Sequence, residues 1–304
     1  MIKKCLIWGI GQVFFDTISA IKYHELRNNL EVIGFTSKID IYKEFYGYKY
    51  IPENDIQPHN TDFILALADN NDYKYITEKA LSLGFKQDQI ISPKVIKHPS
   101  FDINKYSNIL KHKPTIFVNN CWAGITYNSL GLQFNSPFIN MFISDRDYIN
   151  FLKDPHTYID SPIEFLRWEE VSQPSEITRF PTAKCKDISL RFNHYKTFEN
   201  AQDCWERRKK RINWNNLLVV MCTENKDMEK AFNQLPYEKK ICFVPYKSNE
   251  ESSIYIPLTE KEEFKNIPFG RIMNNIAFTD RIGAYYDVFD ILESGKINEV
   301  VKIN

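Results

Sequence analysis

Short apolar runs alternate with amphipathic stretches along the first part of the chain. Continuous apolar residues predict strands that a parallel sheet buries on both faces, at 3–9, 31–35, 62–68 and 89–92. Helices are predicted between them, one from about Gln12 and one over 72–83, where Gly84 follows as a stop. The apolar face of the first helix comprises Val13, Phe14, Ile18 and Ile21. Alternating strands and helices predict the α/β class.

A second alternation follows residues 92–114, a connecting segment rich in proline and lysine with room for one short helix. Its strands are predicted at 115–118, 138–143, 186–192, 216–222, 240–244 and 253–257. Its helices are predicted at 125–132, at 145–152 and from Thr197 to about Ile212, whereas 264–295 has helical character without a definite period. We therefore expect two domains: a Rossmann-like parallel sheet with its linker at 1–113, and a second α/β sheet domain at 114–304 that carries the site.

Composition narrows the class of protein. The 304 residues include 39 basic and 39 acidic ones, so no net charge favours nucleic acid or an anionic membrane as a partner. No apolar run is long enough for a transmembrane segment, and Gly9, Gly11 and Asp16 interrupt the N-terminal run as in a first strand. The six cysteines form no Cys-Xaa-Xaa-Cys pair, which favours a reduced, cytoplasmic protein without a metal site. The oligomeric state stays open.

A glycine turn, Gly9 to Gly11, follows the first predicted strand. Phe14 stands where the dinucleotide fingerprint has its third glycine, and residues 36–38 (TSK) replace the acidic residue that would hold a ribose. A two-glycine turn can still hold a phosphate at a helix N-terminus, which makes Gly9 and Gly11 nucleotide-binding candidates. Glycines equally serve to bring the chain over the sheet edge.

Polar residues follow the strand at 115–118, at the edge where open α/β sheets bind ligands. The carboxamides of Asn119 and Asn120 suit sugar hydroxyls or a developing oxyanion, and Trp122 can stack on a sugar face. Gly124 belongs to the same segment as a further ligand-binding candidate. The alternative is that the asparagines tie the turn and Trp122 belongs to the core.

Cys121 and His194 are the candidates for nucleophilic catalysis. A helix N-terminus can lower a thiol pKa, and His194 can serve as its base if the strands at 115–118 and 186–192 neighbour each other in a parallel sheet. A buried, unreactive thiol is the alternative. Asp145 and Asp147 follow Ser144 in a capping pattern, where ligand carboxylates also occur; Asp145 is a candidate for ligand binding and Asp147 for catalysis.

Arg208 and Arg211 are candidates for a phosphate or carboxylate of the substrate, because a guanidinium grips such groups with two parallel hydrogen bonds. Arg208 lies one turn from Trp205 on an apolar helix face, so it must either be paired inside the protein or face a cleft. An internal ion pair with Asp145 or Asp147 is the alternative.

Several ordered segments carry a family resemblance: NNCWAG at 119–124, LGL at 130–132, SP at 136–137, DYINFL at 147–152, HY at 194–195 and WERRKKRIN at 205–213. Together they resemble the bacterial family catalogued as domain of unknown function 1919, whose members are often labelled exopolysaccharide or capsule biosynthesis proteins. The resemblance covers roughly residues 114–250 and implies surface-polysaccharide assembly, with no established reaction or catalytic set. More loosely, the first domain resembles Rossmann-like modules attached to sugar-modifying transferases.

These observations lead to an expected function. The chain is predicted to be a sugar-directed transferase that uses a nucleotide-sugar or acyl donor on a small-molecule or saccharide substrate. In glycosyl transfer, Arg208 would hold phosphate and Asp145 or Asp147 would assist; in acyl transfer, Cys121 or His194 would carry the chemistry. The alternative is a non-catalytic sugar- or nucleotide-binding scaffold of an assembly complex.

Overall fold

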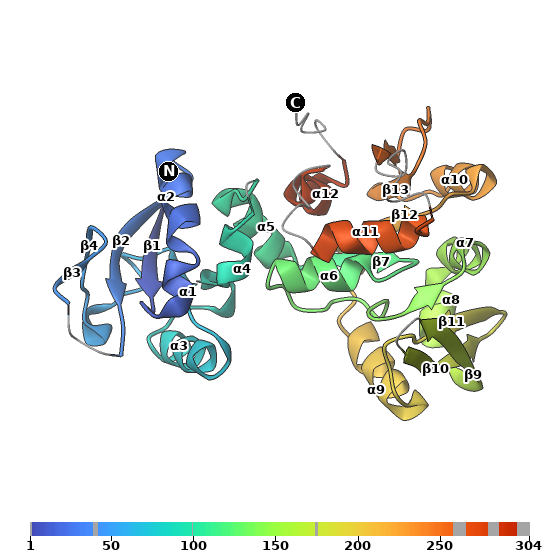
Figure 1. Cartoon of the computed structure of the whole chain (residues 1–304), viewed down its shortest axis with the longest axis horizontal. Helices are drawn as coiled ribbons and strands as arrows, with labels where there is room; N and C mark the ends of the chain where they lie inside the picture. Colours follow the sequence, from blue (N-terminus) through green and yellow to red (C-terminus); the bar gives the residue numbers. More distant parts are fainter. Residues whose placement is uncertain are drawn as a thin grey trace. The chain divides into compact units, whose positions relative to one another are not determined.

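The computed structural model describes residues 2–38, 42–98, 100–173, 176–257, 266–278 and 286–296. The chain folds into two compact units (Figure 1). The first comprises residues 1–112 and 129–131, and the second comprises 113–128 and 132–304. Both contain parallel strands with helices, which confirms the predicted α/β class. No helix of the described ranges is long and apolar enough to cross a membrane.

The first unit contains a parallel four-stranded sheet in the order β2-β1-β5-β6. Its strands are β1 (Lys3–Trp8), β2 (Leu30–Thr36), β5 (Phe63–Ala66) and β6 (Ile90–Ile91), close to the four predicted runs. Two short strands, β3 (Glu44–Phe45) and β4 (Tyr48–Lys49), form a separate pair, and η1 (Glu53–Asp55) and η2 (Gln87–Gln89) are single 3-10 turns. The strand β5 is wholly buried, and β1 is buried from Cys5 to Trp8, as is usual where helices cover a parallel sheet on both faces.

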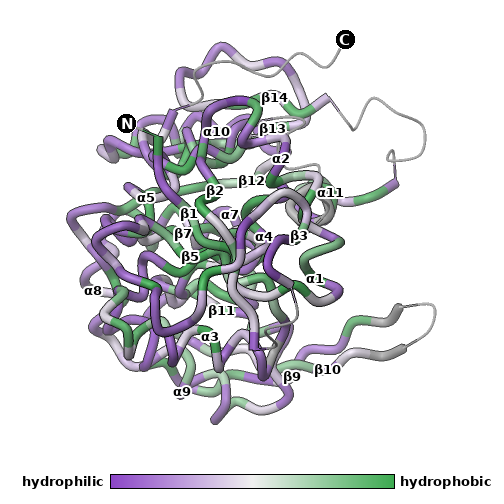
Figure 2. Tube along the Cα trace, turned by 90° about the vertical axis from the view of Figure 1, so that its left-hand side faces the viewer, coloured by the Kyte–Doolittle hydropathy of each residue, from purple (hydrophilic) through white to green (hydrophobic). Residues whose placement is uncertain are grey.

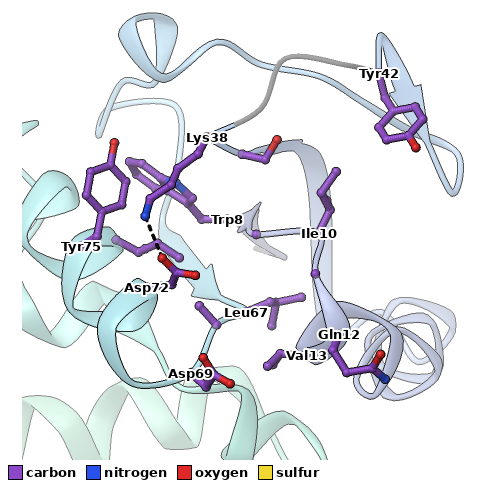
Figure 3. Close-up of a pocket in the computed structure, with 15 residues that line it drawn as sticks. Trp8, Ile10, Gln12, Val13, Lys38, Tyr42, Leu67, Asp69, Asp72 and Tyr75 are labelled. Carbon is purple, nitrogen blue, oxygen red and sulfur yellow. Dashed lines mark hydrogen bonds and ion pairs between the residues drawn. The ribbon is translucent and has the colours of Figure 1, made fainter.

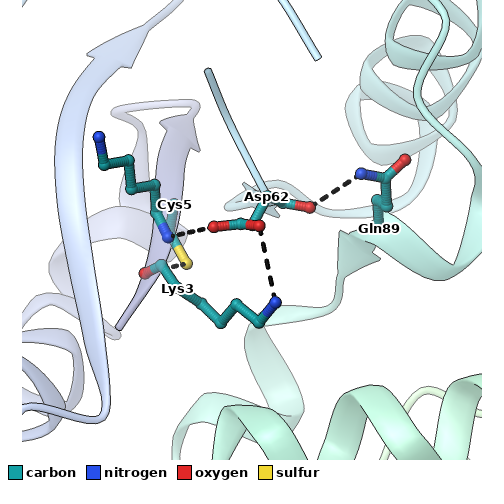
Figure 4. Close-up of polar contacts among 5 residues, drawn as sticks. Lys3, Cys5, Asp62 and Gln89 are labelled. Atoms are coloured by element: carbon teal, nitrogen blue, oxygen red, sulfur yellow. Dashed lines mark hydrogen bonds and ion pairs between the residues drawn. The ribbon is translucent and has the colours of Figure 1, made fainter. Parts of the chain in front are cut away.

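Asp62 fastens the start of β5 to both neighbouring strands (Figure 4). Its carboxylate accepts the Lys4 N–H at 2.8 Å and lies 3.7 Å from the Lys3 ammonium. Its backbone carbonyl accepts a 3.0 Å hydrogen bond from the Gln89 side chain, which precedes β6. One residue therefore satisfies backbone and side-chain groups at the entry to three strands.

The helices of the first unit differ from the prediction in one respect. The helix expected from Gln12 is two helices, α1 (Gln12–Phe15) and α2 (Ile18–Leu26), separated at Asp16 and Thr17. The buried Thr17 hydroxyl donates to the Val13 carbonyl at 2.7 Å, which competes with regular helical bonding. The helix α3 (Asn70–Ser82) confirms the second prediction, and its C-terminal Gly84 has a φ of +96°.

The segment expected to be a linker holds two helices, α4 (Pro93–Ile96) and α5 (Ile103–His112). Ser92 caps the first, and its Oγ accepts the Lys94 N–H at 3.4 Å. One face of α5 is buried through Ile103, Tyr106 and Ile109, so the segment packs as part of the first unit. Of the prolines that suggested a linker, Pro93 is the first residue of α4, where proline is tolerated.

The second unit contains two four-stranded sheets. The parallel sheet has the order β14-β13-β12-β7, with β7 (Thr115–Val118), β12 (Leu217–Cys222), β13 (Lys240–Val244) and β14 (Ser253–Tyr255). The antiparallel sheet has the order β8-β11-β10-β9, with β8 (Phe142–Ile143), β11 (Ile188–Arg191), β10 (Glu176–Cys185) and β9 (Glu164–Gln173). The strand predicted over 138–143 therefore forms only at its end. The strands at 115–118 and 186–192, whose adjacency in a parallel sheet was the condition for His194 to serve Cys121, belong to different sheets.

The hairpin of β9 and β10 has no counterpart in the prediction. Figure 2 shows its two strands side by side, extending outward from the rest of the trace. Several large apolar residues of β9 are exposed, which departs from the apolar periodicity of a buried strand: Phe165, Leu166, Trp168 and Val171.

The helices of the second unit are α6 (Trp122–Ser129), α7 (Asp145–Lys153), α8 (Pro155–Asp160), α9 (Phe198–Lys209), α10 (Lys226–Asn233), α11 (Phe269–Phe278) and α12 (Val288–Ser294), with η3 (Trp214–Asn216) before β12. The last two lie in the region that the sequence left unassigned. An aromatic cluster of Phe117, Phe138, Phe151 and Trp205 joins β7 to the helices α7 and α9. The core thereby holds the carboxyl end of β7 in place.

Gly9 should tolerate alanine much less well than Gly11. Gly9 has a φ of +109°, and a Cβ there would lie 2.6 Å from the Leu67 carbonyl oxygen. A Cβ at Gly11 meets no atom within 4 Å, and its φ is −80°. We expect G9A to lower the free energy of unfolding by roughly 2 kcal/mol or more, and G11A to change it by less than about 1 kcal/mol. Urea unfolding of both variants measures the difference, and equal midpoints would contradict it.

Candidate functional site

A cleft of about 1110 Å³ opens in the second unit beyond the carboxyl ends of β7 and β12. This edge of an open α/β sheet is the usual place for a ligand. Residues after β11 and the first turn of α11 complete the lining, although they are distant in sequence. Six of its lining residues carry carboxamide side chains: Asn119, Asn120, Asn140, Asn193, Asn225 and Asn274. The predicted strand-end segment therefore does open into a cleft.

Asn119 is held by three hydrogen bonds at the base of the cleft. Its Oδ1 accepts the Cys222 N–H at 3.0 Å, and its Nδ2 donates to the Cys222 carbonyl at 3.0 Å. The same Nδ2 donates to Asp145 Oδ1 at 2.9 Å. With these groups engaged, Asn119 positions Asp145 and links β7 to β12.

Asp145 is the best-placed carboxylate of the cleft. It begins α7, where the Ser144 hydroxyl accepts the Asp147 N–H at 3.2 Å, as the capping pattern predicted. The Thr223 hydroxyl donates to Asp145 Oδ2 at 2.5 Å. Burial raises the pKa of Asp145, assisted by the charge of Glu224, while the hydrogen bonds from Thr223 and Asn119 oppose the rise. A carboxylate with a raised pKa in a cleft suits proton transfer.

Cys121 lines the cleft but lacks the features of an activated thiol. Its Sγ lies 4.0 Å from the Met141 carbonyl oxygen, and the side chain is buried. Burial raises its thiol pKa to about 11, against a smaller lowering by the side chain of Asn193. Because the thiolate is the nucleophile, this environment favours the interpretation of Cys121 as an unreactive thiol.

His194 reaches the same cleft by a different route from the one expected. The proposed adjacency in a parallel sheet is wrong, because β11 pairs antiparallel with β10 and β8, whereas β7 pairs with β12. His194 nevertheless lines the cleft with Cys121, and its side chain is exposed. Desolvation lowers its imidazole pKa, so the ring is neutral at pH 7 and can accept a proton.

The other residues of the strand-end segment have different surroundings. Asn120 lines the cleft, and its Oδ1 accepts the Trp122 N–H at 3.0 Å, which caps α6. Trp122 is buried, and its indole donates to the Tyr286 hydroxyl at 2.7 Å, so its ring lies in the core. A Cβ at Gly124 would lie 3.3 Å from the Ile139 side chain, which makes Gly124 a close-packing position.

The basic and acidic candidates outside the cleft are engaged elsewhere. Arg208 is buried beside neutral partners, with hydrogen bonds to the Tyr195 hydroxyl and the Ile139 carbonyl and its guanidinium 5.3 Å from the Phe134 ring. Arg211 donates to the Phe134 carbonyl at 3.4 Å. Asp147 Oδ2 accepts the Ser189 N–H at 3.2 Å. None of these three residues lines the cleft, and the ion pair of Arg208 with Asp145 or Asp147, which was the alternative to ligand binding, is absent among the described residues.

A separate pocket of about 420 Å³ lies in the first unit, beside the glycine turn (Figure 3). Gly9 and Gly11 line it, together with Lys38, whose ammonium lies 2.7 Å from Asp72 and 4.3 Å from the Tyr75 ring centre. The helix α1 after the turn has only four residues, so it supplies little of the dipole that a phosphate requires. Nucleotide binding at Gly9 and Gly11 stays a prediction.

Several cleft residues were not identified from the sequence. Thr223 and Glu224 follow β12, and Lys226, Arg271 and Asn274 lie on α10 and α11. The end of the apolar run at 217–222 is the signal that could have identified Thr223 and Glu224, because it is another strand end of the same sheet. In the described part of the chain, no cluster of three His, Cys, Asp or Glu side chains has the geometry of a metal site.

The thiol of Cys121 should resist alkylation at neutral pH. With a pKa of about 11, roughly one Cys121 side chain in 10⁴ is a thiolate at pH 7. We expect iodoacetamide to modify the half-buried Cys204 first, and Cys121 to gain reactivity only as the pH rises above about 9. Mass spectrometry of tryptic peptides measures both rates. Modification of Cys121 as fast as that of Cys204 at pH 7 would instead show an activated thiol.

Comparison with known proteins covers both units. The family described as a domain of unknown function (DUF1919) matches residues 92–293, and one described as C2185-like, N-terminal, matches residues 1–103. An uncharacterised protein of Haemophilus influenzae is 28% identical over 212 residues, which make up 67% of this chain and 96% of that relative. Every residue of the cleft falls within the first match. Because that match spans more than half of the sequence, the chain belongs to the DUF1919 family.

Proposed function

We propose that the protein is a sugar-directed transferase of bacterial surface-polysaccharide synthesis, which moves a glycosyl group from a nucleotide-linked donor to a saccharide acceptor. The observation that carries the proposal is Asp145, a carboxylate with a raised pKa in a cleft lined by carboxamides. The family resemblance supplies the polysaccharide context. The six unpaired cysteines favour the cytoplasm as the site of action.

The carboxamides support a carbohydrate as the ligand. Each offers both hydrogen-bond donors and an acceptor, which matches the paired donor and acceptor character of sugar hydroxyls. Among the described residues, three of them carry a buried polar atom without a hydrogen-bond partner: Asn120 Nδ2, Asn193 Oδ1 and Asn274 Oδ1. Buried polar groups are normally paired, so these three atoms are unusual features of the cleft wall.

Asp145 and its neighbours provide the chemistry. The acceptor hydroxyl oxygen attacks the anomeric carbon of the donor, and the bond from that carbon to the phosphate oxygen breaks. Asp145 takes the hydroxyl proton, and the bonding electron pair leaves with the phosphate. Thr223 and Asn119 orient the carboxylate, and neutral His194 offers a second proton acceptor on the cleft wall.

Two other functions are compatible with the same cleft. Acyl transfer to a sugar would use His194 as the base, because the high pKa of the Cys121 thiol disfavours a thioester route. A non-catalytic sugar-binding or scaffold protein is favoured by the six carboxamides of the lining, which bind hydroxyl groups without taking part in proton transfer. The scaffold would bind a saccharide and show no turnover with any donor.

Replacement of Asp145 tests the transferase directly. We expect D145N to lower kcat by a factor of about 10² to 10⁴, because the substitution removes the proton acceptor and leaves the size of the side chain unchanged. Release of nucleoside diphosphate from a panel of nucleotide sugars measures the rate. D203N, a matched change on the exposed surface of α9, should keep the wild-type rate. Wild-type turnover in D145N would sink the assignment of Asp145 as the base.

Thr223 should set the acidic limb of the pH–rate profile. Its hydroxyl favours the ionised form of Asp145, so T223V should raise the pKa of Asp145 further. Activity that needs the ionised carboxylate then requires a higher pH, and the acidic limb should move upward by roughly one unit. T223S keeps the hydroxyl and should restore the wild-type limb. A limb that T223V leaves in place, or moves downward, would contradict the role of Asp145.

A further inference from the structure

The pocket of the first unit lies where the strand order of its sheet reverses. The chain continues from β1 to β2 on one side of β1 and later returns to β5 on the other side, so the switch point lies between β1 and β5. Gly9 directly follows β1 and Leu67 directly follows β5, and both line the pocket. Open α/β sheets bind their ligands at this point. The volume of about 420 Å³ lies within the range of roughly 300–1,000 Å³ that small-molecule sites occupy.

Apolar and aromatic side chains form much of the wall. Ile10 is half-buried, and Trp8 below it is 1% exposed, with an indole N–H that has no hydrogen-bond partner among the described residues. The Tyr75 ring is held in place, because its hydroxyl donates to the Glu53 carboxylate at 3.1 Å and the Lys38 ammonium lies 4.3 Å from its centre. A wall that is fixed before binding favours a planar ring, which packs on it at little entropic cost.

The charges of the lining do not suit a phosphate. Lys38 is the one basic side chain among the described lining residues, and Asp72 already binds its ammonium at 2.7 Å. Asp69 and Asp72 are the acidic ones, so one ammonium stands against two carboxylates and leaves one negative charge in excess. An anionic group is repelled by such a lining, whereas a neutral ligand with hydroxyl donors is not.

Asp69 is the group that a hydroxyl-bearing ligand can use. It precedes α3 at the N-cap position, where aspartate usually accepts a backbone N–H, yet its side chain forms no capping hydrogen bond. The side chain is exposed and lines the pocket, and Figure 3 shows its carboxylate apart from the pair of Lys38 and Asp72. A carboxylate accepts a hydrogen bond at each oxygen, which matches the two adjacent hydroxyls of a ribose. In dinucleotide-binding sheets an acidic residue at a strand end has this role.

We propose that this pocket binds a nucleoside through its base and its ribose. The base packs against Ile10 and Tyr75, over the Trp8 indole, and the 2′- and 3′-hydroxyls of the ribose donate to Asp69. Phosphates, where the ligand carries them, extend into solvent and contribute little to the affinity. The inference concerns the first unit alone and does not depend on the proposed transferase, whose candidate base, Asp145, belongs to the second unit.

The four common ribonucleosides are the probes, measured by isothermal titration calorimetry with the full chain. We expect at least one of them to bind saturably, and inorganic pyrophosphate in excess should not displace it. The 2′-deoxy analogue should bind roughly tenfold more weakly, because it lacks one hydrogen bond to a charged acceptor. Displacement by pyrophosphate would identify a phosphate site in its place and would overturn the proposal.

D69A is the decisive variant, because the exposed Asp69 side chain forms no capping hydrogen bond and its removal leaves the fold intact. We expect D69A to bind the ribonucleoside at least roughly tenfold more weakly, and to bind the 2′-deoxy analogue with the same affinity as the ribonucleoside. D55A removes an exposed carboxylate from η1, outside the pocket, and should leave the affinity unchanged. Equal losses in D69A and D55A, or no saturable binding by the wild-type chain, would reject the site.

Tyr75 tests the position of the base. Y75A removes the ring and should weaken binding roughly tenfold, the usual effect for a base that stacks on an aromatic side chain. Y75F keeps the ring and should recover most of the affinity. A loss in Y75F as large as that in Y75A would contradict the packing of the base on this ring.

The result is distinguishable from failure of the transferase. D145N should bind the nucleoside as the wild-type chain does, so a loss in D145N without a loss in D69A would place the nucleoside in the cleft of the second unit and overturn the proposal. Nucleoside binding that depends on Asp69, with no turnover of any nucleotide sugar, would support this site and reject the transferase.

Discussion

The carboxamide of Asn119 holds the end of β7 against β12 and, in the same geometry, aims a carboxylate into the cleft. It bonds both the N–H and the carbonyl of Cys222, so it continues the sheet pairing beyond Val118 with a side chain in place of a strand. The remaining hydrogen of Nδ2 goes to Asp145. Leaving such buried backbone groups unpaired costs about 1–3 kcal/mol each, so fold and site depend on one residue.

The polar groups of the second unit divide into two sets with different roles. Arg208, Arg211 and Asp147 bond to backbone groups and a tyrosine, which stabilises the loops around α9 and β11. The cleft keeps the groups that a ligand can use, namely Asp145, His194 and the cations of α10 and α11. The lining therefore combines anionic, cationic and carboxamide side chains, which suits a polar ligand.

The pocket of the first unit also lies at the carboxyl ends of parallel strands, and it is smaller than the cleft of the second unit. Its turn at Gly9 exists because the chain passes close to the Leu67 carbonyl, which leaves no room for a Cβ. The break between α1 and α2 removes the long helix that a phosphate-binding turn normally precedes. Trp8, Lys38 and Tyr75 instead give this pocket an aromatic wall with one ion pair (Figure 3).

The sequence by itself determined the elements whose signals are local. Apolar runs of parallel strands and the Ser144 cap depend on neighbours in sequence, and β7 and the helix start at Asp145 were predicted to the residue. The sheet to which a strand belongs does not depend on neighbours in sequence alone. β11 pairs with β10 in an antiparallel sheet, and the exposed apolar residues of the β9–β10 hairpin gave no usable period from which to predict that hairpin. Only the tertiary structure could place Gly270 beside Asn120, more than a hundred residues earlier in the chain, or engage Arg208 inside the protein. Such contacts depend on how distant elements pack, and periodicity along the chain carries no information about that packing.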